Sequence, residues 1–257
     1  MTRYTLLSIS FLFIIGCNSK ENDLEKSNFQ GEIKTIKTIE YDVVEKFGKI
    51  TKGIISKYSF NNRYTIYNKE GNIVESNYIK HDGSLISKHT YKYDDKGTLI
   101  EENTYNPDGN LESKYTSKKN NKGNKIEETM FNSGGILKYK YTFRYDEKGN
   151  KIEWNRYNSD GSLNTKSTSK YNEKGYLIEE NTYNPDGSLK SKWTSKYNDN
   201  GNKIEGNTNN FDGSFKYKTS YKYEFDKSGN WIKCIEYFHI NTKLTPHSIT
   251  ENEIEYY

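Results

Sequence analysis

The residues of this chain best suited to chemistry are aromatic side chains that recur at a fixed spacing. Tyr115 and Tyr141 lie 26 residues apart, and Trp193 lies 52 residues further on, at the same position of the pattern. Flat aromatic faces stack on sugar rings, so this strip is a candidate binding surface for a polysaccharide or peptidoglycan. Such a stripe is also typical of the packed face of a sheet, and the two interpretations predict opposite exposure for Trp193.

Motifs for catalysis and for metal binding are missing from the sequence. No cysteine pair, glycine-rich phosphate loop or nucleophile elbow occurs, and the four histidines show no metal-ligand spacing. The Asn/Asp-rich turn at residues 198–202 offers oxygens for calcium but lacks a full ligand set, and backbone geometry explains its composition. We therefore expect no catalytic residues, no metal and no cofactor. A sugar-processing enzyme is the rival class, and it would need an acidic pair in a cleft formed by one copy of the pattern.

The first 16 residues have the form of a bacterial export signal. Arg3 precedes a mostly apolar run from Thr5 to Gly16, which is too short to span a bilayer. The stretch Ile14-Ile15-Gly16-Cys17 resembles the lipobox of bacterial lipoproteins, in which a cysteine becomes the lipidated N-terminal residue. The resemblance implies acylation of Cys17 and a membrane anchor that is effectively permanent.

The expected location is the cell envelope, with the lipid anchor at Cys17 as the contact with the membrane. The polar residues that follow Cys17 favour the outer membrane, on either its periplasmic or its external side. The expected partners are therefore a membrane, and a glycan or an envelope protein. A net charge of +4, evenly spread, is too small to indicate a nucleic-acid partner. Cys234 is the second of two cysteines, so acylation of Cys17 leaves no intrachain disulfide.

The composition favours strands and turns over helices. The 257 residues include no alanine, 24 tyrosines and 19 glycines, which removes the best helix former and supplies strand and turn residues. Only 32% of the residues are hydrophobic, and the mean hydropathy is −1.07, so a large conventional core is not expected. An aromatic content of 15% with nearly balanced charges argues against disorder.

A 26-residue repeat fills residues 67–222 in six copies. A glycine follows the first position of each copy by four residues, and a second turn that ends in glycine follows twelve residues later. The first positions are Tyr67, Tyr93, Lys119, Tyr145, Tyr171 and Tyr197. Each copy is therefore interpreted as two strands of about eight residues with two tight turns, which is the pattern of an antiparallel meander.

The turn before Gly187 predicts the register of the strands that flank it. A four-residue turn would set Glu179 opposite Lys192 on one face and Ile178 opposite Trp193 on the other. All six copies hold glutamate and lysine at these two positions, so the register predicts six ion pairs on a charged face and a separate apolar face. The apolar face must be covered, so we expect the sheet to twist or to roll on itself.

The copies resemble the YD repeats of the Rhs family. The segments Tyr93-Asp94-Asp95-Lys96-Gly97 and Tyr145-Asp146-Glu147-Lys148-Gly149 carry the Tyr-Asp-x-x-Gly core, and the Asp-Gly-x-Leu half is similar to MORN-variant repeats. The resemblance implies a β-sheet repeat fold of hairpins, and in large Rhs proteins a shell around a toxin. Six copies are too few for such a shell.

The expected organisation is an all-β, antiparallel array of hairpin repeats in a twisted or rolled sheet. The parts are a signal peptide (1–16), a polar tether (17–31), divergent N-terminal capping strands (32–66), the six repeats (67–222), and a partial seventh repeat with a C-terminal cap (223–257). The expected function is that of a non-catalytic binding or spacing module of the envelope. The alternatives are a polysaccharide- or peptidoglycan-binding protein and an immunity-like protein against an Rhs-type toxin.

Overall fold

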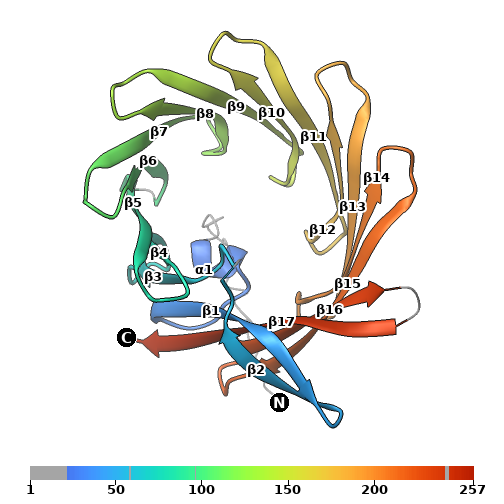
Figure 1. The fold of residues 1–257 in the computed structure, drawn as a ribbon. Helices are drawn as coiled ribbons and strands as arrows, with labels where there is room; N and C mark the ends of the chain where they lie inside the picture. The colour runs from blue at the N-terminus through green and yellow to red at the C-terminus, as the bar shows by residue number, and fades with distance from the viewer. Residues whose placement is uncertain (1–21, 58, 96, 241–242) are drawn as a thin grey trace, which may run out of the picture.

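The computed structural model describes residues 22–257 except 58, 96 and 241–242, and it is built almost entirely from antiparallel strands. Sixteen of the seventeen strands, all except β2, form a closed barrel in which each strand pairs with its neighbour in the chain (Figure 1). Closure comes from β1, which pairs with β3 on one side and with β17 on the other. The all-β meander is therefore confirmed, but the sheet is a closed barrel and not an open sheet that twists or rolls.

The single helix of the described chain is α1 (Asp23–Lys26), and the strands have the following bounds. They are β1 (Ile33–Lys46), β2 (Lys49–Ile55), β3 (Arg63–Tyr67), β4 (Ile73–Ile79), β5 (Leu85–Tyr93), β6 (Leu99–Tyr105), β7 (Leu111–Lys119), β8 (Lys125–Asn132), β9 (Leu137–Tyr145), β10 (Lys151–Asn158), β11 (Leu163–Tyr171), β12 (Leu177–Tyr183), β13 (Leu189–Tyr197), β14 (Lys203–Asn210), β15 (Phe215–Phe225), β16 (Trp231–Ile240) and β17 (Lys243–Tyr256).

The terminal regions of the chain close the ring. β1 pairs with β17 from Ile33–Tyr256 to Asp42–Ser248, so the strands expected to cap the two ends of an array lie side by side. β2 pairs with the last part of β1 and forms a hairpin that projects from the ring (Figure 1). No end of the repeat array is left to be capped, because the array has become circular.

Two sets of tight turns form the two ends of the barrel. The near end holds the turns before Gly71, Gly97, Gly123, Gly149, Gly175, Gly201 and Gly229, and the far end holds those before Gly83, Gly109, Gly135, Gly161, Gly187 and Gly213. These glycines all have φ between +68° and +88°, a left-handed conformation that side chains with a Cβ rarely adopt. The predicted turns at both ends of each copy are therefore confirmed.

The register between β12 and β13 differs by two residues from the predicted one. Glu179 lies opposite Thr194, and Lys192 lies opposite Asn181. The ion pair nevertheless forms on the diagonal, with Lys192 Nζ 2.7 Å from Glu179 Oε2. The five equivalent glutamate–lysine pairs also form, at 2.6–3.7 Å. The predicted ion pairs are confirmed, and the direct opposition of Glu179 and Lys192 is wrong.

A longer turn and a β-bulge explain this difference. The Asn184 backbone N–H donates to the Ser188 carbonyl at 2.9 Å, so the turn is one residue longer than predicted and sets Tyr183 opposite Leu189. A bulge next to Tyr183 then shifts the register by one more residue. Each change moves the pairing by one position, and together they place the glutamate and the lysine on a diagonal.

A second cation, which the sequence analysis did not identify, holds five of the six glutamates. Lys170 lies directly opposite Glu179 on β11, and its Nζ is 2.8 Å from Glu179 Oε1. Lysine or arginine occupies the same place beside Glu101, Glu127, Glu153 and Glu205. These five glutamates are therefore each bracketed by cations from both neighbouring strands.

This ladder of charges lies on the outside of the barrel. α1 lies inside the ring (Figure 1), and Tyr93 Oη donates to Asp23 Oδ2 of α1 at 2.8 Å, so Tyr93 points inward. Successive residues of a strand point to opposite faces, so Lys88 and Lys92 of the same strand point outward. Because the copies are equivalent, the same assignment holds for the others: the glutamate–lysine pairs lie outside, and the residues at the first position of each copy lie inside.

The predicted pairing of Ile178 with Trp193 is wrong. Trp193 lies opposite Glu180, and Ile178 is the extra residue of a β-bulge next to Tyr171. The equivalent Ile100, Ile126 and Ile204 are 48%, 38% and 40% exposed. The isoleucines and the aromatic residues therefore do not form one packed apolar face, as the sequence analysis expected.

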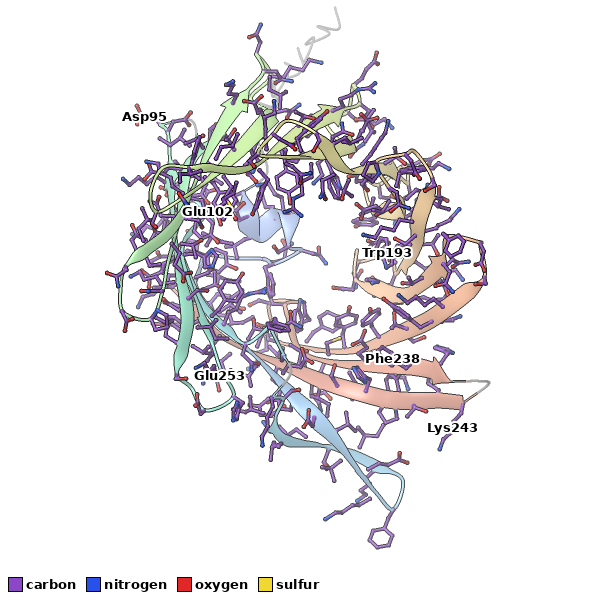
Figure 2. All side chains as sticks on the ribbon, turned by 45° about the horizontal axis from the view of Figure 1, so that its top comes forward. Asp95, Glu102, Trp193, Phe238, Lys243 and Glu253 are labelled. Carbon is purple, nitrogen blue, oxygen red and sulfur yellow. The ribbon has the colours of Figure 1, made fainter. Side chains whose placement is uncertain are left out.

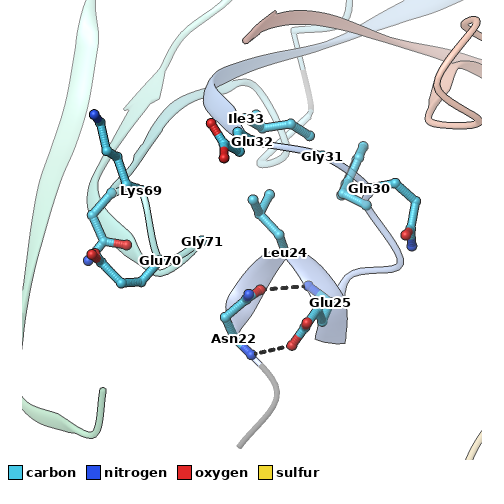
Figure 3. A pocket seen from close by; sticks show the side chains of 12 residues that line it. Asn22, Leu24, Glu25, Gln30, Gly31, Glu32, Ile33, Lys69, Glu70 and Gly71 are labelled. Atoms are coloured by element: carbon cyan, nitrogen blue, oxygen red, sulfur yellow. Dashed lines mark hydrogen bonds between the residues drawn. The ribbon is translucent and has the colours of Figure 1, made fainter. Parts of the chain in front are cut away.

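The buried core lies on one side of the barrel, where the N-terminal segment meets β1, β3 and β17. Leu24, Phe29, Ile33, Ile36 and Tyr67 form the buried cluster. Residues 22–31 were expected to be part of a polar tether, but in the described chain they are folded. They contain α1, which begins with a capping box, and a pocket of about 150 Å³ lies beside it (Figure 3).

The N-terminal segment is attached to turns at the near end of the barrel. The Leu24 N–H donates to the Gly71 carbonyl at 3.1 Å, Asn28 Nδ2 donates to the Asn200 carbonyl at 2.9 Å, and the Gln30 N–H donates to Asn230 Oδ1 at 2.6 Å. Residues 22–31 are therefore fastened to the near end of the barrel. Among the described residues, no helix is long and apolar enough to cross a membrane.

Candidate functional site

The three predicted aromatic residues all lie on the inner wall of the barrel. Tyr115 is on β7, Tyr141 is on β9 and Trp193 is on β13, each four residues before the inward-pointing position equivalent to Tyr93. Trp193 and Glu102 are labelled in Figure 2, where they lie on the inner side of the ring. The structure brings Tyr115 and Tyr141 together, whereas Trp193 lies four strands beyond Tyr141.

Tyr115 and Tyr141 belong to a continuous aromatic cluster across β7, β9 and β10. The Tyr115 and Tyr139 hydroxyls are 2.9 Å apart, and the Tyr139 and Tyr141 ring centroids are 5.4 Å apart. Tyr141 also contacts Trp154 edge to face, with centroids 5.9 Å apart. Edge-to-face contacts of this kind hold the rings in fixed orientations.

Polar contacts fix Trp154 at one side of this cluster. Trp154 Nε1 donates to Glu180 Oε1 at 3.0 Å, and Ser167 Oγ donates to the same oxygen at 2.7 Å. Ser167 lies directly opposite Trp154 and is fully buried. The hydrogen bond from its ring nitrogen to Glu180 therefore fixes the position of the Trp154 indole.

Arg156 is a cation of this part of the wall that has no acidic partner in the described chain. Its guanidinium carbon lies 4.5 Å from the centroid of the Tyr139 ring. Arg156 Nε is buried and has no hydrogen-bond partner among the described residues, and no carboxylate of the described chain forms an ion pair with Arg156. By contrast, Arg144 on the outer wall pairs with Glu153 at 3.4 Å.

Two lysines line the wall beside the cluster. Lys125 forms an ion pair with Glu128, and its Nζ lies 5.7 Å from the centroid of the Phe143 ring. Lys151 Nζ lies 5.5 Å from the same ring, and burial lowers the pKa of Lys151. Burial likewise raises the pKa of the Tyr115 hydroxyl. The wall therefore combines aromatic faces, hydroxyls that remain protonated at neutral pH, and cations.

Trp193 has a separate environment. Lys203 Nζ lies 4.6 Å from the centroid of the Trp193 ring and 4.8 Å from that of Tyr221, and it donates to Tyr221 Oη at 3.2 Å. Burial lowers the pKa of Lys203. Trp193 therefore forms a second, smaller cation–aromatic contact on the same inner wall.

The aromatic wall is not part of the buried core. Tyr115, Tyr141 and Trp193 are all of intermediate exposure, and the described chain has no buried hydrophobic residue from β4 through β15. In ring order β10 lies opposite β1, where the N-terminal segment packs. We expected the curvature of the sheet to cover this aromatic face, and this expectation is wrong. The face lies on the inside of the barrel, but its side chains remain partly exposed there.

Sequence reasoning missed Tyr139, Trp154, Arg156 and Glu180 as members of this wall. The sequence does distinguish two of these residues from the repeat. Trp154 replaces a glutamate that three other copies have, and Arg156 replaces a threonine that three other copies have. The outward glutamate, in contrast, is the same in all six copies. Departures from the repeat therefore mark the inner wall of β8–β10.

The remaining predicted sites have simple outcomes. Cys17, the predicted lipidation site, lies outside the described residues. Cys234 is partly buried and free, and burial raises the pKa of its thiol to about 12, so the thiol is unreactive at neutral pH. Within the described ranges, no group of three or more histidine, cysteine, aspartate or glutamate side chains is placed to hold a metal ion.

Comparisons with known proteins bear on the fold alone. No protein-family model matches the sequence, and no curated protein matches it. The barrel is similar to the crystal structure of a porin-like protein from Bacteroides uniformis ATCC 8492, with 16% identity and a TM-score of 0.56 over 87% of this chain and 96% of that chain.

Two further solved structures match more distantly. A porin-like protein from Bacteroides vulgatus ATCC 8482 has 11% identity and a TM-score of 0.38 over 89% of this chain and 99% of that one. A Photorhabdus luminescens Tc holotoxin pore structure has 12% identity and a TM-score of 0.33 over 82% of this chain, which spans only 14% of that chain. These TM-scores are too low to support an argument about either fold or function.

Proposed function

We propose that this chain is a non-catalytic, lipid-anchored envelope protein whose barrel binds a glycan along its inner wall. The observation that carries the proposal is the half-buried aromatic wall of β7–β10, which no part of the described chain packs against. Aromatic faces that remain accessible beside polar groups are suited to stacking on sugar rings. This proposal combines two expectations from the sequence, a non-catalytic binding module of the envelope and a polysaccharide- or peptidoglycan-binding protein.

The charged residues on the outside of the barrel favour a barrel that is surrounded by water and does not cross the bilayer. A transmembrane barrel needs an apolar band about 25 Å tall on its outside, and charged side chains at mid-membrane each cost about 2–4 kcal/mol. Here the six glutamates and their cationic partners ring the outside of the barrel. Most repeat strands have 7–9 residues, whereas a membrane strand needs about 9–11.

The anchor at Cys17 supplies the membrane attachment in this proposal. Five residue steps separate Cys17 from Asn22, and an extended chain covers about 3.6 Å per step, so the near end of the barrel is held within about 18 Å of the membrane. The far end then faces away from the membrane. The likeness to a porin-like protein supports an envelope location.

One substitution tests the anchor and the aqueous barrel together. Cys17→Ser removes the only acceptor of the diacylglyceryl group, so the variant should be left as an uncleaved or a soluble form, and the soluble form should move from the detergent phase to the aqueous phase in a phase-partition assay. Retention of a form that lacks residues 1–17 in the detergent phase would contradict the proposal, because it would mean that the barrel itself holds the protein in lipid. The matched variant Cys234→Ser should partition like the wild type.

A glycan array tests the binding function. The full-length protein in detergent should retain polysaccharide or peptidoglycan fragments, and Tyr141→Ala should weaken this binding by about tenfold, since one stacked ring contributes about 1–3 kcal/mol. Tyr183→Ala, which removes an outward-facing tyrosine, is the matched control and should bind normally. Absence of any glycan ligand would overturn the function.

A further inference from the structure

We propose that the wall formed by Tyr139, Tyr141, Trp154 and Arg156 is a site for a carboxylate-bearing sugar. This inference rests on the proposed glycan-binding function and names the class of glycan. The site combines an aromatic cluster, which can stack on a sugar ring, with a guanidinium group that has no acidic partner in the described chain. A planar guanidinium binds a carboxylate with two parallel hydrogen bonds.

The charge balance of the wall selects an anion over a cation. Three cations (Lys125, Lys151 and Arg156) and two carboxylates (Glu128 and Glu180) lie at this part of the wall. Glu128 pairs with Lys125, whereas the hydrogen bonds that Glu180 accepts from Trp154 and Ser167 hold it without cancelling its charge, so one positive charge is left over at the aromatic cluster. A cationic ligand would add to this charge, whereas an acidic ligand would neutralise it.

The orientation of Arg156 fits this role. The guanidinium lies over the Tyr139 ring, which fixes its plane, and Nε is buried without a hydrogen-bond partner in the described chain. A buried donor without a partner is costly, so the fold itself gains nothing from the Nε of Arg156. Three of the other copies hold threonine at this position, so the repeat fold does not require arginine there.

Two kinds of envelope-accessible glycan share this chemistry. Polyuronates carry a carboxylate on the sugar ring, and peptidoglycan glycan strands that lack their stem peptides carry one on the lactyl group of the muramic acid. Oligogalacturonate, its neutral methyl ester and muramic-acid-containing glycan strands are therefore the probes, titrated against the full-length protein in detergent by calorimetry. The acidic probe that binds more tightly identifies the source.

The expected result is that an acidic probe binds at least tenfold more tightly than the neutral ester. Arg156→Gln should remove this preference while leaving the weak binding of the ester intact, and Arg156→Lys should retain part of it. Arg144→Gln, on the outer wall, is the matched control and should bind both probes like the wild type. Thermal melts of each variant separate a loss of binding from a loss of folding.

Each possible failure points to a different error. Binding of neither probe, together with an empty glycan array, would overturn the proposed function and this site with it. Equal binding of the acid and the ester would leave glycan binding in place and overturn the acidic ligand. A preference for the acid that survives Arg156→Gln would show that another part of the barrel recognises the carboxylate, and would overturn the site.

Discussion

The bracketed glutamate at position 179 makes the stability of the barrel depend on pH. Hydrogen bonds from Lys170 and then from Lys192 lower the pKa of Glu179 from 4.5 to about 2. A carboxylate whose pKa is lowered by folding stabilises the folded state fully above pH 4.5. This contribution is then lost as the pH falls from 4.5 toward 2. Glu179→Gln should therefore destabilise the barrel at neutral pH, and the effect should shrink in acid.

The exposure of the lysines sets the size of this effect. The Glu179 side chain is 16% exposed, but those of Lys170 and Lys192 are 69% and 40% exposed, so water screens both ion pairs. Exposed pairs contribute about 0.2–1 kcal/mol each, and the two together should contribute about 1 kcal/mol. For a domain of this size, that loss lowers the melting temperature by about 2–4 °C.

Thermal melts followed by circular dichroism between pH 7 and pH 2 measure this effect. The matched control is Glu173→Gln, which removes an exposed glutamate of the neighbouring turn that has no ion pair in the described chain. This control should melt like the wild type at every pH. A gap between wild type and Glu179→Gln that stays constant from pH 7 to pH 2 would refute the role of the bracketed carboxylate.

Three further changes test the turns, the inner wall and the N-terminal segment by thermal melting. Gly187→Ala places a Cβ on a residue with a φ of +84° and should lower the free energy of unfolding by about 1–2 kcal/mol. Gly134→Ala, at a residue without a left-handed φ, should lower it little, and equal effects of the two changes would contradict the turn geometry. Tyr171→Phe loses the hydrogen bond from its hydroxyl to a backbone carbonyl and should cost about 1 kcal/mol, and an equal loss in the outward Tyr183→Phe would count against it. Leu24→Ala empties part of the buried cluster and should cost about 2–5 kcal/mol and expose the N-terminal segment to protease; unchanged protection would show that the segment is held by its hydrogen bonds alone.

The local features of the barrel were predictable from the sequence, because they repeat. The glycine-ended turns and the alternating strand residues of each copy define hairpins wherever they occur, and the glutamate–lysine pairs follow from them. The register was wrong by two because the turn is one residue longer than predicted and because a bulge adds one more residue. A bulge leaves little trace in the sequence, so Lys190, the extra residue of this bulge, looked like an ordinary strand position.

Closure of the ring was not predictable from any single copy. It depends on the pairing of β1 with β17, between residues more than 200 positions apart, and their sequences depart from the repeat. Residues 22–31 looked like a polar tether because only Leu24 and Phe29 supply large apolar side chains, and their burial depends on a barrel that the segment itself does not specify. Tyr115, Tyr141 and Trp193 do share one face of the sheet, as the alternation of strand residues predicts, but the register error paired that face with the isoleucines.

Because the strands pair in a closed circle, the number of repeat copies determines the width of the barrel. In an open array, one more copy lengthens the molecule and leaves the others unchanged. In this ring, loss of one copy removes two strands and about 10 Å of circumference, so the diameter shrinks by about 3 Å before strand tilt is considered. Duplication of a 26-residue segment would widen the barrel by the same step and move the walls of β9 and β13 apart. A change in the number of copies can therefore alter the width of the barrel with no change in any residue of its inner wall.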